Sequence, residues 1–521
     1  MAQKVNLDAM IPRADFASKP DEESSAEKIQ TFSIEQLKQD SLLVHRLRKP
    51  DFQRETSHWD PKQILVFLKS FLDNELVPSV ILWHSPSHVF VIDGGHRIST
   101  LRAWIEDDYG DGPISSKFYL GTIPEDQKRV AKRVRDLVNR EIGTYSALRA
   151  AMIDQESYSD DVMKKRARNL ATRSLSLQWV EGDAARAETS FFKINTQGTP
   201  LHKTEERLLR ERRNPVAISA RSIVRAGTGH KYWSRFDEDS KNKIEASALE
   251  LHNLLFQPEI NEPIKTLDLP LGGRSSPIGA LNLLMDFIAT AAREPNVDVK
   301  DWLINKPDVD GTATVKALNQ CADVMRRITG NDAASLGLHP AVYFYNHRGK
   351  HSDYLFLAVT RVFARAIQDN NKEFFKKFTK CRGAVEKFLI KNKALINQAI
   401  VQIGSTQRVD RLSSMFSGLV NSFLNNEEVD TGKLLLLLGL QGKLVASELE
   451  GATQNFTAEA KSAIYLRQSL ANALTCPICT GLVDANKSAS YDHIKRKSDG
   501  GMGGPENGQI THPYCNTAIK N

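Results

Sequence analysis

Two pairs of soft metal ligands bracket the final stretch of the chain. Cys476 and Cys479 form the first pair, His512 and Cys515 form the second, and two residues separate the members of each pair. This spacing lets both side chains of a tight turn reach one metal ion. Four such ligands close a tetrahedral Zn²⁺ shell and leave no position open for a substrate. The sequence therefore predicts a structural zinc site.

A second set of polar residues lies between these pairs and directly after the second pair. It suits phosphodiester hydrolysis, which needs a general base and a cation that stabilises charge. His493 is a suitable base, because an imidazole exchanges a proton near neutral pH. Asp492, its neighbour on a predicted strand, points to the opposite face and can hold a hard cation such as Mg²⁺. Asn507 would fix the glycine-rich loop over 499–504, and Asn516 would supply a second ligand to the cation.

The order of these residues resembles the HNH endonuclease family over residues 476–521. The resemblance implies that His493 is the general base, that Asp492 and Asn516 bind the catalytic metal, and that the loop is fixed as described. Two positions depart from the usual pattern. The last motif residue, often histidine, is Asn516, and the second zinc pair is HxxC rather than CxxC, so we assign His512 to zinc. A zinc knuckle that only folds the tail or binds nucleic acid stays open as an alternative.

A second candidate site lies where a predicted strand runs into a glycine turn and then a helix. The turn reads Asp93-Gly94-Gly95-His96-Arg97. It presents backbone N–H groups and a helix N-terminus to an anion. The glycines allow close approach to a phosphate, Arg97 can pair with it, and Asp93 can hold Mg²⁺. Arg54 and Asn195 are candidates to complete the pocket. The alternative is a plain turn between strand and helix.

Residues 31–215 resemble the ParB/sulfiredoxin-like N-terminal domain of modification-dependent restriction nucleases of the GmrSD and SspE type. The motifs that carry the resemblance are Phe52-Gln53-Arg54, Trp59, the box at 93–97 and the segment FFKINTQGTPLHKTE at 191–205. The resemblance implies a sensing pocket that includes Gln53, Arg54 and Asn195 beside the box.

In that family the box is implicated in binding and hydrolysing nucleoside triphosphates, and modified DNA is the trigger. Gly95 and His96 replace two glutamines of the family's box. The resemblance therefore implies nucleotide binding more strongly than nucleotide hydrolysis. The resemblance alone implies the trigger, and no residue indicates which nucleotide or which DNA mark is read.

Composition describes an ordinary globular protein. The chain has 521 residues, of which 41% are hydrophobic and 26% charged, so more than one core is expected. A net charge of +7 suits an anionic partner such as DNA. Cys321 and Cys381 are expected as buried thiols, and nothing indicates a disulfide framework. With no apolar signal segment and no run long enough to span a bilayer, we expect a cytoplasmic protein.

Hydrophobic periodicity predicts the elements that must position both sites. Pro61 opens a helix, and the runs over 79–84 and 88–93 are typical of two adjacent strands that lead into the glycine turn. Basic helices are expected over 128–140 and 163–173. Their charge is either a solvated face or a set of phosphate contacts.

We therefore expect an α+β multidomain protein in four parts, with no fixed-period repeat. The parts are a flexible tail over 1–30, a ParB/sulfiredoxin-like α/β sensing domain over 31–215, a mostly α-helical domain over 216–460, and a zinc-braced ββα-metal (HNH) domain over 461–521. Within the helical part, residues 373–403 predict one or two amphipathic helices with a lysine-rich face.

Our hypothesis is a DNA endonuclease of a prokaryotic anti-phage or restriction system that cuts double-stranded phage or modified DNA. It would use structural Zn²⁺, a catalytic Mg²⁺ or another divalent cation, and a nucleoside triphosphate as a gating ligand. A homodimer or a partner defence protein would fit this hypothesis, and no membrane partner is expected. Two alternatives remain open. One is an NTP-switched DNA-binding regulator whose zinc knuckle only binds DNA, and the other is a nuclease whose N-terminal domain is only a scaffold.

Overall fold

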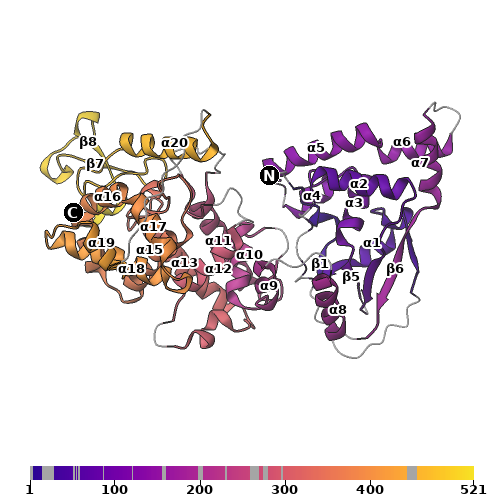
Figure 1. Cartoon of the computed structure of the whole chain (residues 1–521), viewed down its shortest axis with the longest axis horizontal. Helices are drawn as coiled ribbons and strands as arrows, with labels where there is room; N and C mark the ends of the chain where they lie inside the picture. The colour runs from indigo at the N-terminus through magenta and orange to yellow at the C-terminus, as the bar shows by residue number, and fades with distance from the viewer. Residues whose placement is uncertain are drawn as a thin grey trace. The chain divides into compact units, whose positions relative to one another are not determined.

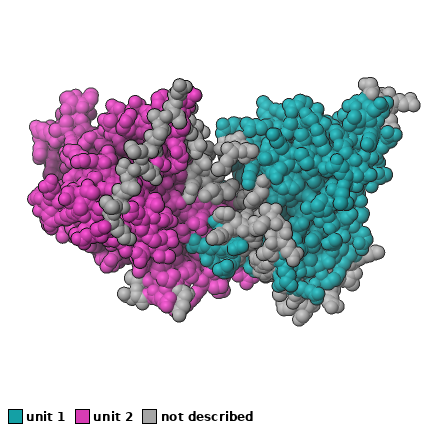
Figure 2. All heavy atoms as spheres, in the orientation of Figure 1, with its two compact units in different colours: residues 1–212, 228–232 teal, residues 213–227, 233–521 magenta. Residues whose placement is uncertain are grey.

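The structure, a computed structural model, describes residues 4–14, 28–442 and 455–520. Short gaps inside the second range are 51–52, 54–55, 57–58, 86, 120, 122, 155–159, 183, 198–202, 229–230, 259–268, 274–279 and 295–296. The chain forms two compact units. Unit 1 comprises residues 1–212 and 228–232, and unit 2 comprises residues 213–227 and 233–521 (Figure 2).

Unit 1 contains a mixed six-stranded sheet (Figure 1). Its strands are β1 (Arg13–Ala14), β2 (Thr31–Ser33), β3 (Leu47–Pro50), β4 (Val80–His84), β5 (Val89–Asp93) and β6 (Ser174–Val180). The order across the sheet is β1-β3-β5-β4-β6-β2. β3 runs parallel to β5, whereas β4 and β5 are antiparallel, with Trp83 opposite Phe90. This pairing confirms the adjacent strands predicted from the two β-rich runs.

Helices account for most of the rest of unit 1. They are α1 (Leu42–Arg46), α2 (Pro61–Leu72), α3 (Gly95–Ile105), α4 (Pro113–Phe118), α5 (Glu125–Glu141), α6 (Tyr145–Ile153), α7 (Asp161–Thr172), α8 (Ala184–Gln197) and α9 (Lys203–Arg210). α2 begins where the sequence predicts, because Asp60 and Gln63 form a capping box around Pro61. Leu68 of α2 is buried in the same hydrophobic core as Leu82 of β4.

Residues 4–14 correct our expectation of a flexible tail over 1–30. Apolar side chains of this segment are buried in the core of unit 1. Asp8 Oδ1 accepts hydrogen bonds from Lys49 Nζ at 2.6 Å and from Arg13 Nη2 at 2.9 Å, and all three side chains are buried. A buried ion-pair network places polar residues in the interior, where composition alone would not put them. Most of the remaining tail lies outside the described residues.

The two basic helices of unit 1 direct part of their charge inward. Arg135 of α5 donates to Asp107 at 2.8 Å and to Asp111 at 2.6 Å. Arg166 of α7 donates two hydrogen bonds to Asp73, at 2.7 and 2.8 Å. These arginines hold the fold together, so contact with nucleic acid phosphates is left to the other basic residues of α5 and α7.

Unit 2 is mostly helical and ends in a small hairpin. Its α-helices are α10 (Pro215–Val224), α11 (Glu238–Phe256), α12 (Leu281–Ala291), α13 (Thr312–Ile328), α14 (Pro340–Tyr343), α15 (Asp353–Gln368), α16 (Lys372–Lys391), α17 (Lys393–Gln402), α18 (Arg408–Leu424), α19 (Thr431–Leu437) and α20 (Ala458–Asn472). The hairpin strands are β7 (Ser490–His493) and β8 (Gly508–Thr511), and a short π-helix, η9 (Cys515–Ile519), follows them.

The expectations for two helices and for two cysteines of this unit are confirmed. α16 and α17 cover the range for which one or two amphipathic helices were expected. Cys321 and Cys381 are buried free thiols. None of the helices in the described parts of the chain has the length and apolar character needed to cross a bilayer.

Candidate active site and metal centre

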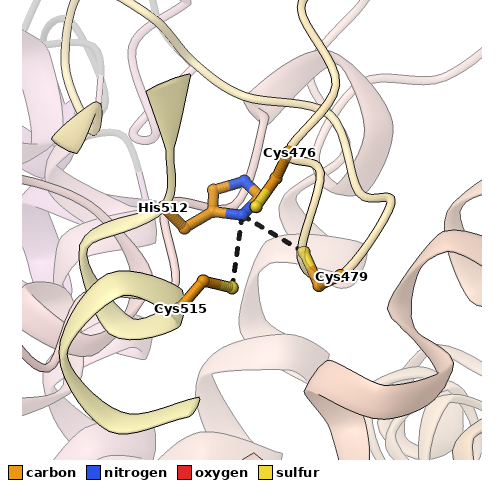
Figure 3. Close-up of side chains that lie close together, drawn as sticks. All are labelled: Cys476, Cys479, His512 and Cys515. Atoms are coloured by element: carbon orange, nitrogen blue, oxygen red, sulfur yellow. Dashed lines mark hydrogen bonds between the residues drawn. The ribbon is translucent and has the colours of Figure 1, made fainter. Parts of the chain in front are cut away.

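The four predicted zinc ligands come together in one buried cluster (Figure 3). The ligand atoms of Cys476, Cys479, His512 and Cys515 all lie within 4.8 Å of one another. His512 Nδ1 lies 3.3 Å from Cys479 Sγ and 3.8 Å from Cys515 Sγ. Zn–S bonds of about 2.3 Å and Zn–N bonds of about 2.0–2.1 Å place tetrahedral ligands roughly 3.5–3.8 Å apart. The donor set therefore fits a metal ion such as zinc.

The thiols of the cluster share their protons unevenly, because hydrogen bonds with Cys476 raise the pKa of Cys479 and of Cys515. Hydrogen bonds from Cys479 and Cys515 hold the pKa of the Cys476 thiol far below its usual range. Burial lowers the pKa of His512, which favours the neutral imidazole that a metal ligand requires. His512 Nε2–H donates to the Leu482 carbonyl oxygen at 3.0 Å, and this bond leaves Nδ1 facing the thiols.

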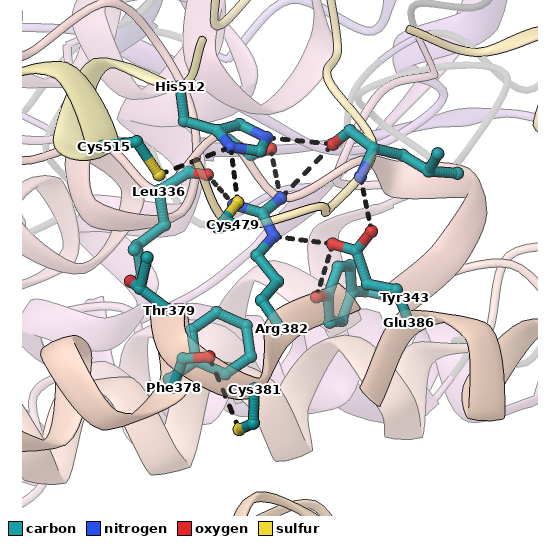
Figure 4. A network of polar contacts seen from close by, with 12 residues as sticks. Leu336, Tyr343, Phe378, Thr379, Cys381, Arg382, Glu386, Cys479, His512 and Cys515 are labelled. Atoms are coloured by element: carbon teal, nitrogen blue, oxygen red, sulfur yellow. Dashed lines mark hydrogen bonds and ion pairs between the residues drawn. The ribbon is translucent and has the colours of Figure 1, made fainter. Parts of the chain in front are cut away.

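A buried ion pair on α16 supports the cluster from below (Figure 4). Arg382 Nε donates to Glu386 Oε1 at 2.7 Å, and the two side chains are 0% and 2% exposed. Glu386 Oε2 accepts the backbone N–H of Leu482 at 2.6 Å, and Glu386 Oε1 also accepts the Tyr343 hydroxyl at 2.8 Å. Arg382 Nη2 donates to the Gly337 carbonyl oxygen at 3.0 Å. The carbonyl that orients His512 thus belongs to a residue held by this pair, which sequence reasoning missed.

Glycines let the metal-binding turn approach α16 closely. A Cβ at Gly383 would lie 1.9 Å from Thr480 Oγ1, so no side chain fits there. The backbone N–H of Gly383 donates to the Cys479 carbonyl oxygen at 3.2 Å. A Cβ at Gly481 would lie 2.5 Å from Arg382 Nε. The turn therefore packs directly on the backbone of α16.

The hairpin presents the predicted catalytic pair on opposite faces. Asp492 is opposite Gln509, and His493 is opposite Gly508. Asp492 is 7% exposed, and its Oδ2 accepts hydrogen bonds from Gln509 Nε2 and from Lys520 Nζ, both at 2.7 Å. Lys520 Nζ also donates to the His493 carbonyl oxygen. Gln509 and Lys520 both hold the carboxylate proposed as a metal ligand, although neither was expected from the sequence.

Both predicted asparagines contact the hairpin or its loop. Asn507 Nδ2 donates to the Met502 carbonyl oxygen at 2.8 Å and to the Lys495 carbonyl oxygen at 3.1 Å, and its Oδ1 accepts from Lys495 N at 2.7 Å. This is the geometry that a loop-fixing amide requires. Asn516 Nδ2 donates to Ser490 Oγ at 2.8 Å, so Asn516 lies against β7 near Asp492.

The glycine box of unit 1 has the predicted strand–turn–helix geometry. Gly94 has a φ of 95°, and a Cβ there would lie 2.8 Å from Val80 Cγ2, so a glycine is required. Arg97 Nη2 donates to Asp93 Oδ2 at 2.7 Å and to the Ser79 carbonyl oxygen at 3.1 Å. Arg97, expected to bind phosphate, and Asp93, expected to bind Mg²⁺, are therefore paired with each other.

Other proposed pocket residues reach the box to different extents. Gln53 Nε2 donates to the Ile92 carbonyl oxygen at 3.3 Å, while its buried Oε1 has no hydrogen-bond partner among the described residues. A Cβ at Gly95 would lie 3.9 Å from Gln53 Nε2. His96 stacks on Trp59 with ring centroids 5.3 Å apart. Arg54 and the side chain of Asn195, which lies on α8, are outside the described part of the chain.

Comparison with known proteins finds two family models. Residues 34–211 match the N-terminal domain of the GmrSD restriction endonuclease, and residues 476–521 match the HNH endonuclease. Neither the curated proteins nor the solved structures contain a match to the chain. The two matched ranges agree with the architecture expected from the sequence. The chain therefore joins a segment that matches the GmrSD restriction endonuclease N-terminal domain to a C-terminal segment that matches the HNH endonuclease.

Proposed function

We propose that the protein is a DNA endonuclease of a prokaryotic restriction or anti-phage system. The observation that carries this proposal is the Asp492–His493 pair on β7, held beside a cluster of three cysteines and one histidine within the range that matches the HNH endonuclease. Double-stranded DNA, either phage DNA or modified DNA, is the proposed substrate.

In this proposal His493 accepts the proton of the attacking water, because its half-buried imidazole lies at the end of β7 with the glycine-rich loop beside it. Asp492 and Asn516 would hold Mg²⁺ or another divalent cation, whose oxygen-ligand preference suits a carboxylate and an amide. When bound, that cation would stabilise charge on the phosphate. Asn507 keeps the loop beside the hairpin, and Gln509 orients the Asp492 carboxylate.

The cysteine–histidine cluster is proposed to hold Zn²⁺ in a structural role. Four protein ligands fill a tetrahedral shell, so the ion would take no part in chemistry. Cys515 is the first residue of η9, which also carries Asn516. Zinc would therefore fix the position of the second catalytic ligand relative to β7.

The N-terminal domain is proposed to have a ParB/sulfiredoxin-like fold and to gate cleavage by sensing a nucleoside triphosphate, modified DNA or both. Support comes from the glycine turn at Gly94 and from the buried Oε1 of Gln53 near Gly95, which has no hydrogen-bond partner among the residues that the structure describes. Binding of a triphosphate would require Arg97 to exchange its contact with Asp93 for a phosphate oxygen. A homodimer or a partner defence protein would fit a double-strand cut, since each chain carries one HNH domain.

Cleavage of modified and unmodified phage DNA, with Mg²⁺ and with or without each nucleoside triphosphate, tests the proposal. His493→Ala should abolish cleavage, while zinc content and the circular dichroism spectrum stay at the wild-type level. If wild type and His493→Ala behave alike on every substrate, the nuclease proposal is wrong, and DNA binding without cleavage would favour the regulator. If cleavage occurs but no triphosphate binds or changes it, and modification has no effect, the N-terminal domain acts as a scaffold.

A further inference from the structure

Three large apolar side chains near the catalytic histidine face solvent. Tyr491 is 82% exposed, Ile494 is 55% exposed and Met502 is 78% exposed. Single exposed apolar residues are common on protein surfaces, but a group of them marks an interaction site. These three, called the apolar rim below, all belong to the β7–β8 hairpin and its connecting loop (Figure 1).

The apolar rim borders His493. Side chains alternate along a strand, so Tyr491 and His493 share one face of β7 while Asp492 is buried on the other. Ile494 follows His493 directly. On the loop side, a Cβ at Gly503 would lie 3.9 Å from His493 Nε2, which places the residue after Met502 against the imidazole.

The exposure of Met502 is built into the loop. Asn507 Nδ2 donates to the carbonyl oxygens of both Met502 and Lys495, at 2.8 and 3.1 Å. The Ile494 N–H donates to the Asn507 carbonyl oxygen at 2.8 Å. The backbone next to each of these two rim residues is therefore held by one asparagine, and their side chains are presented to solvent by a fixed scaffold.

The surroundings of the apolar rim select an anionic partner. Lys495, Arg496 and Lys497 follow Ile494 without interruption, and all three are exposed. Asp499 and Glu506, also exposed, are the acidic residues of the same loop. A protein partner would be complementary to the apolar side chains alone and not to the basic run. Apolar side chains beside a run of basic residues match the bases and sugars of DNA flanked by phosphates.

Resting on the proposed nuclease function, we propose that the apolar rim contacts the bases and sugars beside the scissile phosphate of duplex DNA and unstacks one base step there. Apolar side chains that insert between base steps kink the duplex, and an aromatic ring stacks on any base regardless of sequence. The basic run would hold the flanking phosphates. The cutting domain would thus distort the DNA locally, and the N-terminal domain would supply selectivity.

Binding of a fluorescently labelled duplex by the full chain, in a His493→Ala background without cleavage, tests this proposal across a salt series. Tyr491→Ala and Met502→Ala should each weaken binding about tenfold, with an unchanged salt slope, because they remove stacking and apolar contact. Lys495→Ala should instead reduce the salt slope by about 1. Leu76→Ala, which removes a 98% exposed leucine of unit 1, is the matched control and should change neither quantity.

Base unstacking is tested with 2-aminopurine on either side of the mapped cut. Its fluorescence should rise on binding of the parent and stay flat with the Tyr491→Ala/Met502→Ala double variant. Parent-like binding and fluorescence in the double variant would overturn the proposal. So would a change in sedimentation of the double variant without a change in DNA affinity, because the apolar rim would then join copies of the chain. If wild type cuts no DNA, the proposed function fails, while the binding series still decides the role of the apolar rim.

Discussion

The metal cluster of unit 2 and the glycine box of unit 1 differ in how completely their polar groups are satisfied. In the cluster, His512 and Leu482 both have hydrogen-bond partners, and the Arg382–Glu386 pair below is fully buried. At the box, Gln53 keeps a buried oxygen without a partner in the described chain. A closed, satisfied site is a structural element, whereas an unsatisfied buried acceptor indicates room for a ligand.

Metal removal should have the largest effect. Chelation, or Cys476→Ser, should unfold the β7–β8 hairpin, because the binding free energy of a structural zinc, about 10–16 kcal/mol in small domains, contributes to folding. Calorimetry with metal analysis should show loss of zinc and a lowered transition for unit 2. Cys321→Ser changes a buried thiol outside the cluster and should leave the zinc content unchanged. A hairpin that keeps its structure after complete chelation would contradict the closed-site interpretation.

Breaking the Arg382–Glu386 ion pair beneath the cluster should have the second-largest effect. Arg382→Met leaves Glu386 buried without its cation and should lower the free energy of unfolding by about 3–5 kcal/mol in urea titrations. The double variant Arg382→Met/Glu386→Leu should recover much of that loss. Arg365→Met removes an 84% exposed arginine that pairs with Asp369, and it should change stability by less than about 1 kcal/mol. Equal effects of the two single variants would remove the distinction between buried and surface pairs.

Gln53→Met tests whether the glycine box of unit 1 has room for a ligand. The substitution removes Oε1, which has no partner in the described chain, and the long hydrogen bond from Nε2 to the Ile92 carbonyl oxygen. It should therefore change the free energy of unfolding by about 1 kcal/mol or less. Binding of a nucleoside triphosphate, measured by calorimetry, should weaken about tenfold if Gln53 contacts the ligand through one hydrogen bond. Gln63→Met, which breaks the capping box of α2, is the opposite control: it should lower stability and leave binding unchanged. A large stability loss with Gln53→Met would mark Gln53 as structural.

The smallest predicted effect concerns Lys520. Its ammonium lies 2.7 Å from Asp492 Oδ2, so it competes with a divalent cation for that carboxylate. Lys520→Met should lower the Mg²⁺ concentration for half-maximal cleavage roughly fivefold, which corresponds to about 1 kcal/mol, the lower limit for one charge at this range. Lys497→Met removes an exposed lysine of the loop between β7 and β8 and should not shift that concentration. A higher Mg²⁺ requirement in Lys520→Met would show that the lysine positions Asp492 instead.

Sequence patterns predicted the features that depend on local spacing. The pairs at Cys476 and His512 indicated one cluster because each pair fits a single turn, and α2 was predicted from Pro61 and its apolar periodicity. The strand–turn–helix at Gly94 followed from the same kind of local signal.

Features that depend on distant partners were not predictable from one sequence. Arg382 looked like one more basic residue of an amphipathic helix, and only its contact with the Leu482 segment, a hundred residues away, gives it a role. Asp8 was assigned to a flexible tail because its partner Lys49 lies on β3, 41 residues further along the chain. Lys520 belongs to no motif, although its spacing from Asn516 on η9 could have suggested that both face β7.

The close packing at Gly383 limits how the C-terminal segment of this protein can be exchanged with that of a related protein. Gly383 has no side chain, so its backbone forms part of the surface against which Cys479 and Thr480 pack. Residues 455–520, which include the HNH segment, would lose this packing surface of α16 and the contact with Arg382 if they were grafted onto an unrelated protein. Exchange of cutting domains between related proteins should therefore succeed only when the donor also contributes α16. Selection would treat the helix and the metal-binding turn as a single heritable module, although about ninety residues of chain separate them.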